Sequence, residues 1–313
     1  ARGSRSAGAP VMTGTILTPG SRVGAETMEK AARGRSLWDD ARRRLLRNKA
    51  AVGGMIVLGL LVLAAIIGPY FTPYAYDQIN KDHVWAPPLT QGHLLGADSL
   101  GRDLLARLLT GLRVSLAIGL VATTVSLIIG VAWGAIAGYL GGRIDEIMMR
   151  VVDVLYSLPF IFFVILLMVT FGSNIILIFV AIGAVEWLTM SRIVRGQTLS
   201  LKHKEFVEAA RAAGLGDGGI IAKHIIPNLL GPVVVYVTLT IPAVILAESF
   251  LSFLGLGVQP PMASLGTLIA NGAQDMELAW WLLVFPSLTM VVTLMSFNFI
   301  GDGLRDAIDP KDR

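Results

Sequence analysis

The side chains best suited to chemistry are four histidines and two glutamates in or near apolar stretches. The histidines show no H-E-x-x-H pattern or comparable metal-ligating spacing, and all fall in connecting segments: His83, His93, His203 and His224. Cysteine is absent, which excludes disulfides, thiolate zinc sites and thiol nucleophiles. The sequence therefore favours no metal centre, and no nucleophile or carboxylate cluster converges in it.

The two glutamates in apolar surroundings are Glu186 and Glu248. A charged side chain inside a membrane costs at least about 2.5 kcal/mol to insert, so such residues can mark a proton relay. Glu186, however, lies close to Arg192, and Glu248 lies close to the outer end of its apolar run. The sequence favours interfacial placement or pairing for both residues.

Nucleotide chemistry has no motif in this chain. The pattern G-x-x-x-x-G-K-[ST] is absent, so the chain does not bind ATP through a P-loop. The glycine-rich LGLGVQPP at Leu254–Pro261 lacks a third glycine and a preceding strand, and therefore predicts a turn rather than a phosphate site.

One polar stretch interrupts the apolar sequence: EFVEAARAAGLGDGGIIAKHIIPN, residues Glu205–Asn228. Its first part predicts a helix whose small and apolar residues repeat at i, i+3, i+4 and i+7 along one stripe: Phe206, Ala209, Ala210 and Ala213. Charges on the other face have the spacing of helical ion pairs, which predicts that Glu208 pairs with Lys204 and Arg211.

The rest of this stretch predicts a turn and a second short helix. Gly214 followed by Leu215 is typical of a helix C-terminus with glycine in the left-handed conformation. Asp217 is expected to cap a second helix through Ile225, which Pro227 ends while fitting the first turn of the next apolar run. A compact helical hairpin whose alanines permit close docking of a partner is one interpretation; an amphipathic connector resting on lipid headgroups is the other.

The elements that must position this hairpin are membrane helices. Mean hydropathy is +0.67 and only 15% of residues are charged, against about 25% in a soluble domain. Six apolar runs are long enough to cross about 30 Å of hydrocarbon. They cover Ala50–Tyr70, Val114–Tyr139, Val152–Phe171, Asn174–Met190, Asn228–Phe250 and Ala279–Ile300.

The distribution of basic residues sets the orientation. With the N-terminus inside, 22 of the 26 Lys and Arg fall in segments on the inner side. This positive-inside bias assigns both termini and the hairpin to the cytoplasm. The basic pI of about 9.5 therefore reflects topology, and we expect contact with membrane lipid and none with nucleic acid.

The sequence divides into three parts. Residues 1–35 are rich in Gly, Ala, Ser, Thr and Arg and are expected to form a disordered cytoplasmic tail, in which Met12 or Met28 could be a start. Residues 36–49 predict an interfacial amphipathic helix. Residues 50–313 predict a six-span domain with an outer loop at 71–113, a cytoplasmic loop at 191–227 and a cytoplasmic tail at 301–313.

Two further patterns concern packing. Gly130, Gly134 and Gly138 lie at four-residue spacing in the second run and predict a seam for close helix packing. In the outer loop, four leucines at the same spacing predict a short helix along the outer face: Leu100, Leu104, Leu108 and Leu112.

The polar hairpin resembles the E-A-A loop of permeases of binding-protein-dependent ABC importers, with Glu208, Ala209, Ala210, Gly214 and Pro227 in register. His224 and Ile226 depart mildly from the closing end of that pattern. Over about residues 37–310 the chain is similar to the second permease subunit of dipeptide and oligopeptide importers. Four stretches carry that similarity: His93–Leu116, Met149–Pro159, Glu248–Pro261 and Phe297–Pro310.

The resemblance implies an all-α, six-span permease of type I fold in the bacterial inner membrane, coupled through the hairpin at residues 202–226. It implies a homologous second permease, two ATPase subunits or one fused ATPase, and an extracytoplasmic substrate-binding protein. This chain would bind no cofactor, since ATP and Mg²⁺ belong to the partner subunits. Peptides are the expected cargo, with nickel chelates or glutathione-like compounds as alternatives. A stand-alone secondary transporter would need mid-membrane ionisable groups or broken helices.

Overall fold

A computed structural model describes residues 37–172 and 174–308, and the predicted disordered tail at 1–35 lies outside them. Regular secondary structure in these ranges is helical. The α-helices are α2 Leu37–Arg47, α3 Lys49–Ile67, α4 Leu104–Leu140, α5 Gly142–Ser157, α6 Phe160–Phe171, α7 Ile175–Leu201, α8 Glu205–Ala212, α9 Asp217–Ile220, α10 Ile226–Phe253, α11 Leu265–Gln274 and α12 Trp281–Ile308. Short 3-10 turns cover Gly68–Tyr70 and Lys81–His83, and a π turn covers Ile221–Ile225.

Five helices in the described ranges are long and apolar enough to cross a membrane, and the bent pair of α5 and α6 gives a sixth crossing if it is counted as one span. The third predicted run falls on α5 and α6, which meet at a bend of 81° after Ser157. Pro159 lies at this break, and proline disfavours helical backbone in the residue before it. The sequence predicted one continuous span here, because composition alone does not reveal the bend.

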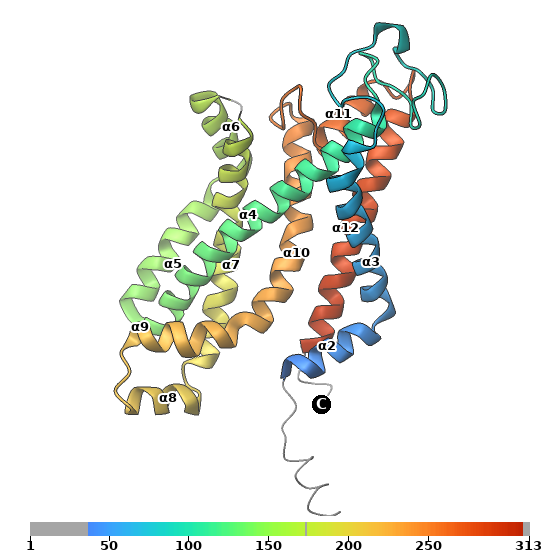
Figure 1. The fold of residues 1–313 in the computed structure, drawn as a ribbon. Helices are drawn as coiled ribbons and strands as arrows, with labels where there is room; N and C mark the ends of the chain where they lie inside the picture. Colours follow the sequence, from blue (N-terminus) through green and yellow to red (C-terminus); the bar gives the residue numbers. More distant parts are fainter. Residues whose placement is uncertain (1–36, 173, 309–313) are drawn as a thin grey trace, which may run out of the picture.

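The helices form two groups with α10 between them (Figure 1). On one side α4 packs along α7, and on the other α12 packs along α3. Helix α10 contacts both α4 and α12, and α11 lies against the outer parts of α4, α10 and α12. The buried apolar residues form several clusters along these contacts rather than one central core.

The α4–α7 contact depends on the three glycines at four-residue spacing. A Cβ at Gly130 would lie 2.6 Å from the Cβ of Met190, and one at Gly138 would lie 2.8 Å from the Cβ of Thr198. Gly134 approaches the backbone of α7 at Ser191. Small residues on one stripe therefore let the two helix backbones come close, in a membrane where lipid gives little hydrophobic drive for association.

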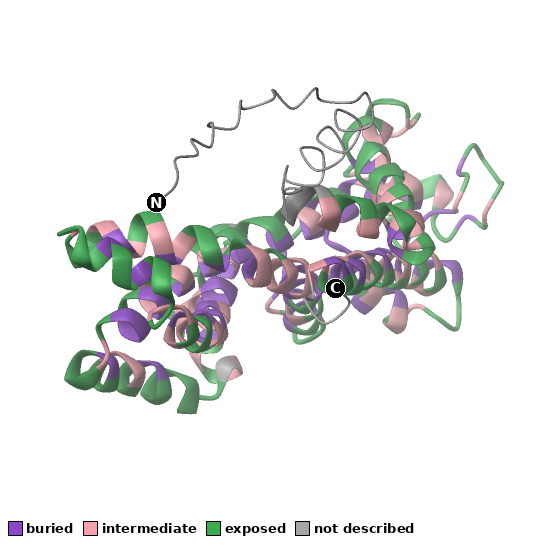
Figure 2. Cartoon of the chain, turned by 90° about the horizontal axis from the view of Figure 1, so that it is seen from below, coloured by how far each residue is buried: buried purple, intermediate pink, exposed green. Residues whose placement is uncertain are grey.

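The outward faces of the helices are largely exposed (Figure 2), and many of the exposed residues are large and apolar. On α3, for example, Ile56 is 59% exposed and Leu60 is 60% exposed. A soluble domain rarely leaves contiguous apolar surface of this extent, so these faces are suited to lipid or to another membrane subunit.

Helix boundaries differ from the predicted runs mainly at the aqueous ends. Helix α4 starts at Leu104, where the Asp103 side chain accepts a hydrogen bond from the backbone N–H of Ala106. The predicted separate outer helix is therefore wrong: Leu104, Leu108 and Leu112 belong to the first turns of α4 and are buried. The short outer helix of the structure is α11, which begins with a capping box at Ser264.

At the inner end, helices extend further than the apolar runs. Helix α7 continues to Leu201 and α12 to Ile308, so residues 191–201 and 301–308 are helical rather than loop or tail. Helix α2 lies within the predicted interfacial segment and packs against α12 and α3. It lies at the same end of the molecule as α8 and α9, as does the end of α12 (Figure 1).

Candidate functional site

The polar hairpin projects from the inner ends of α7 and α10 (Figure 1). Its first arm is α8, and its second arm runs from Asp217 through the π turn into α10 without a break. Pro227 therefore lies in the first turn of α10 and does not end a separate helix. The predicted second helix is an inward extension of the fifth span.

Gly214 forms the turn between the two arms. Its φ is +82°, and the N–H of Gly214 donates to the carbonyl of Arg211 at 3.0 Å while that of Leu215 donates to the carbonyl of Ala210 at 3.1 Å. These two bonds form the Schellman arrangement that ends a helix at a left-handed glycine. Gly214 has the conformation that the sequence pattern predicted.

Tyr139, at the inner end of α4, joins the two arms. Its hydroxyl donates to Oδ1 of Asp217 at 3.2 Å and accepts from Nη2 of Arg211 at 3.2 Å. The hydrogen bond to Tyr139, together with nearby carboxylates, raises the pKa of Arg211 above its ordinary value. One phenol thus bonds to both α8 and the start of α9 and holds them against α4.

Apolar packing also holds the hairpin against the membrane helices. Val207 and Ala210 form the buried face of α8. They join a cluster built from α4, α7, the second arm and α10: Ala135, Tyr139, Met190, Val194, Ile220, Ile225, Leu229 and Val233. Burying one aliphatic side chain stabilises a folded protein by about 1.5–3 kcal/mol, so this cluster holds the hairpin firmly against the helices. A displacement of the hairpin would have to move α4, α7 and α10.

The outward face of the hairpin carries small and charged residues. Glu208, Ala209 and Ala213 are exposed, and Phe206 is 37% exposed. The predicted stripe is thus divided, because only Ala210 among its four residues is buried. An exposed surface of alanines bordered by charges can take a closely fitting partner, since short side chains let another backbone approach.

Two local predictions for the hairpin are wrong. Asp217 is the first residue of α9 rather than its cap, which is Gly216, and its carboxylate bonds to Tyr139 instead. The expected pairs of Glu208 with Lys204 and Arg211 do not form among the described residues, where Arg211 reaches Tyr139. Asp217 and Arg211 each bond to the distant Tyr139 instead of to a local partner.

The two membrane glutamates lack the ionic partner that was one of the two expectations for them, among the described residues. Glu248 is fully buried in α10, and it accepts hydrogen bonds from three serine hydroxyls: Ser252 at 2.6 Å, Ser264 at 2.6 Å and Ser115 at 3.5 Å. Arg192 pairs with Asp153 at 2.9 Å, and no ion pair to Glu186 occurs within the described ranges. Glu248 thus joins α4, α10 and α11 at the outer end.

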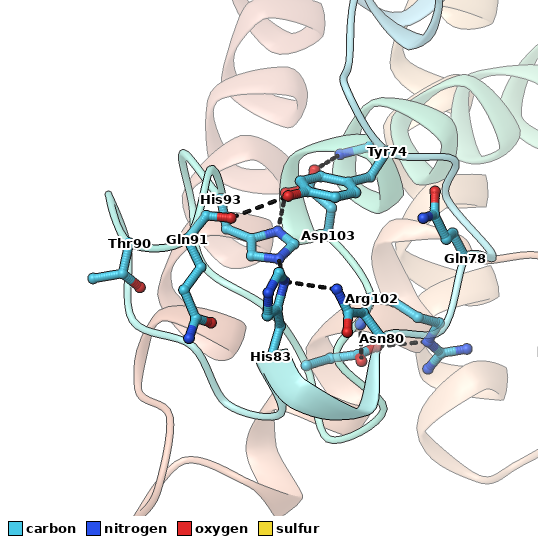
Figure 3. Close-up of polar contacts among 12 residues, drawn as sticks. Tyr74, Gln78, Asn80, His83, Thr90, Gln91, His93, Arg102 and Asp103 are labelled. Carbon is cyan, nitrogen blue, oxygen red and sulfur yellow. Dashed lines mark hydrogen bonds and ion pairs between the residues drawn. The ribbon is translucent and has the colours of Figure 1, made fainter.

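A second polar group that the sequence did not predict lies in the outer loop (Figure 3). Nδ1 of His93 lies 2.8 Å from Oδ1 of Asp103, and its Nε2 lies 2.9 Å from Nδ1 of His83. Tyr74 stacks on His93 with ring centroids 4.5 Å apart. The part of the chain that the structure describes has no group of three or more acidic or histidine side chains arranged to hold a metal ion.

Comparison with known proteins identifies the family. Residues 130–313 match the family described as binding-protein-dependent transport system inner membrane component. Residues 36–88 match the N-terminal membrane domain of oligopeptide transport permease C. The chain belongs to the binding-protein-dependent inner membrane component family. It is the non-catalytic permease of an ABC transporter, located in the inner membrane, and such permeases act with ATPase and binding-protein partners.

Relatives and a solved structure agree with this membership. The oligopeptide transport system permease protein OppC of Haemophilus influenzae is 54% identical over 91% of this permease and 92% of its own length. OppC of Escherichia coli is 54% identical over 94% of this permease and 99% of its own length. The inward-facing MetNI methionine ABC transporter is 18% identical, with a TM-score of 0.54 over 64% of this permease and 96% of that chain, which supports the fold alone.

Tyr139 and Glu248 are the structurally important residues that sequence reasoning missed or misplaced. Tyr139 was the last residue of an apolar run, and its partners are 72 and 78 residues away. No helical period connects such distant positions. The signal that was available was weak: a tyrosine at an aqueous boundary usually finds a hydrogen-bond partner for its hydroxyl.

Proposed function

We propose that this permease forms half of the translocation pathway of an ATP-driven importer for oligopeptides and dipeptides. The names of the two OppC relatives support an oligopeptide cargo. The other half would be a homologous permease, whose contact with this chain is supported by the large apolar faces left exposed on its helices. ATP and Mg²⁺ would be bound by two ATPase subunits, or by one fused ATPase, on the cytoplasmic side.

The exposed hairpin anchored to α4, α7 and α10 is the observation that carries this proposal. Residues 202–226 would dock on an ATPase through the exposed face of α8, and closure of the ATPases would push the hairpin as one body. Tyr139 and the buried cluster under α8 would pass that movement to three membrane helices. The geometry supports coupling more than attachment to headgroups, because the hairpin bonds to helix ends.

Charge reversal at Glu208 separates these two interpretations. Glu208→Lys changes an exposed residue, so the permease should insert and fold normally. A coupling surface would then lose ATPase association or uptake, whereas a headgroup-bound connector would gain affinity for anionic lipid. Glu277→Lys, at an exposed position in the outer segment, is the matched control. Normal peptide uptake and normal ATPase binding in Glu208→Lys would refute the coupling proposal.

Backbone geometry gives a second test. A Cβ at Gly214 meets no atom within 4 Å, so a substitution there is limited by its φ of +82° and not by space. Gly214→Val should distort the turn at a cost of about 1–2 kcal/mol, while Gly214→Asn should retain it because asparagine tolerates this conformation. Uptake that falls in the valine variant and persists in the asparagine variant supports a role for the turn geometry; equal uptake in both would contradict it.

Cargo is tested by uptake in a strain that lacks the endogenous permease. Labelled dipeptides, tripeptides and longer peptides are compared with nickel chelates and glutathione. Saturable, ATP-dependent uptake of peptides that requires this chain supports the proposal. Uptake of nickel or glutathione with no peptide uptake would assign the alternative cargo.

A further inference from the structure

Two adjoining cavities lie at the outer end of the molecule, between the start of α4, the turn after α10 and α11. One has 150 Å³ of water-accessible space and the other 220 Å³. Three polar side chains line both: Arg102, Arg107 and Asn271. In the smaller cavity these two arginines are the only ionisable side chains among the described residues that line it.

Arg107 is buried, and its one ionic partner among the described residues is distant and shared with Arg102. Only 3% of its side chain is exposed. Among the described residues its guanidinium makes two long contacts, with Oδ2 of Asp98 at 3.5 Å and with the carbonyl of Tyr76 at 3.4 Å. A guanidinium has five N–H donors and is costly to bury unless they are hydrogen-bonded. Arg107 therefore has unused donors beside the cavity that it lines.

The local charges leave an excess of positive charge. Arg102 donates from Nε to Oδ2 of Asp98 at 2.8 Å, so this one carboxylate serves both arginines. Asp275 lines the larger cavity and not the smaller one. Two guanidiniums that share one carboxylate attract a further anion into the smaller cavity, where water competes less than at an open surface.

The walls of this site are held in place on both sides. Oδ1 of Asp98 accepts from the backbone N–H groups of Leu100 and Arg102, both at 2.9 Å, which fixes the turn that carries Arg102. At the end of α10, Ser252 lines the smaller cavity and donates to Glu248, which also accepts a hydrogen bond from Ser264 at the start of α11. Such a preorganised arrangement loses little entropy when it binds a ligand.

We propose that Arg102 and Arg107 form a binding site for the C-terminal carboxylate of a peptide at the outer mouth of the permease. A carboxylate fits the planar, bidentate donor geometry of a guanidinium. The remaining wall has amide groups from Gln259 and Asn271 and apolar surface from Val258 and Met262, which suit the last peptide unit and its side chain.

The size of the cavity favours the end of a peptide as its occupant. Sites for complete small molecules usually measure about 300–1,000 Å³, so 150 Å³ admits only a terminal portion of a ligand. The carboxylate is also the group that free peptides of every sequence share. This choice rests on the proposed peptide cargo, and an acidic side chain of the binding protein is the competing source of the same chemistry.

Uptake of trialanine as the free acid and as its C-terminal amide tests the site. The assay uses proteoliposomes with the assembled importer and its loaded binding protein. Arg102→Gln and Arg107→Gln should each reduce uptake of the free acid about tenfold, the effect of losing charge-assisted hydrogen bonds, and leave uptake of the amide unchanged. Arg107→Lys should retain part of the preference, because a point charge attracts a carboxylate but does not bind it bidentately.

Arg113→Gln is the matched control, since Arg113 is an exposed arginine on the same helix, and it should leave both uptake rates unchanged. Yield of the intact complex measures assembly. If Arg107→Gln does not assemble, Arg102→Gln still decides the question, because Arg102 lies nearer the solvent with 12% of its side chain exposed.

The outcomes separate the two sources of carboxylate and the two proposals. Selective loss of free-acid uptake supports the site. Equal loss of acid and amide in assembled complexes overturns it. Weaker binding of the unloaded binding protein in the arginine variants would assign the carboxylate to that protein and also overturn it. If the wild-type importer transports neither form, peptide import itself is refuted, and the site with it.

Discussion

The Gly134→Ala substitution tests the close packing of α4 on α7. A Cβ at Gly134 would lie 2.8 Å from the Cβ of Val194, which is 0.6 Å short of ordinary contact at 3.4 Å, and 2.9 Å from the backbone nitrogen of Arg195. It would also press on the carbonyl oxygen of Ser191. Because two of these three atoms belong to the backbone, a rotamer change does not relieve the clash, and the helices must separate.

Gly196→Ala provides the control for this experiment. Gly196 lies on α7, is exposed, and has no atom within 4 Å of a built Cβ. Both substitutions gain the helix propensity of alanine over glycine, about 0.5–1 kcal/mol, so this gain cancels in the comparison. What remains is the overpacking cost at Gly134, which is about 1–3 kcal/mol for an added methyl group in a well-packed interior.

Thermal unfolding of the purified permease in detergent measures the difference. At about 2–4 °C per kcal/mol, Gly134→Ala should unfold several degrees below Gly196→Ala. Peptide uptake should fall with it, because α7 leads directly into the hairpin. Equal unfolding temperatures for the two variants would refute the reasoning, since they would mean that α4 and α7 accommodate a side chain where the glycine stripe leaves no room.

Three further predictions concern other parts of the molecule. Tyr139→Phe keeps the ring in its apolar cluster but removes the hydroxyl that bonds to Arg211 and Asp217. ATPase binding should therefore persist while the amount of peptide taken up per ATP hydrolysed falls, and an unchanged ratio would contradict the role given to that hydroxyl. Thr123→Val should raise the free energy of unfolding by about 1 kcal/mol, because the buried Thr123 hydroxyl has no partner among the described residues. Thr124→Val is the control: the Thr124 hydroxyl is exposed and donates to the carbonyl of Leu120, so its loss should change the unfolding temperature little. In intact cells Gln91→Cys should react with an impermeant thiol reagent and Ser200→Cys should not, and labelling at position 200 from outside would refute the orientation.

Sequence reasoning succeeded where the signal is local. The membrane helices follow from long apolar runs, and the turn at Gly214 follows from a glycine and an apolar residue placed directly after a helix. Helix ends were less accurate because hydropathy measures contact with lipid and not backbone hydrogen bonding. Helix α4 therefore starts ten residues before its apolar run, at the cap provided by Asp103.

Contacts between distant segments were not predictable from one sequence. Glu248 was expected near an interface because a buried carboxylate is costly, yet three serines from α4, α10 and the start of α11 surround it. Ser115 is 133 residues from Glu248. The two outer arginines were counted only as external positive charges, although folding places Arg107 beside cavities that α11 also lines. In each case the fold changed the environment of a charged group.

Helix α4 links the two proposed sites. Arg107 lies in its second turn at the outer cavity, and Tyr139 lies in its last turn at the hairpin, so 32 residues or about 48 Å of helix separate them. Within α4 no proline interrupts the backbone ladder, whereas α10, which runs from the hairpin to the smaller cavity, contains Pro232 and Pro242. A helix without such a break moves as a rod, while prolines allow bending. A push on the hairpin would therefore displace Arg107 through α4 and would bend α10, which would change the distance between Arg107 and Ser252, the residues of these two helices that line the smaller cavity.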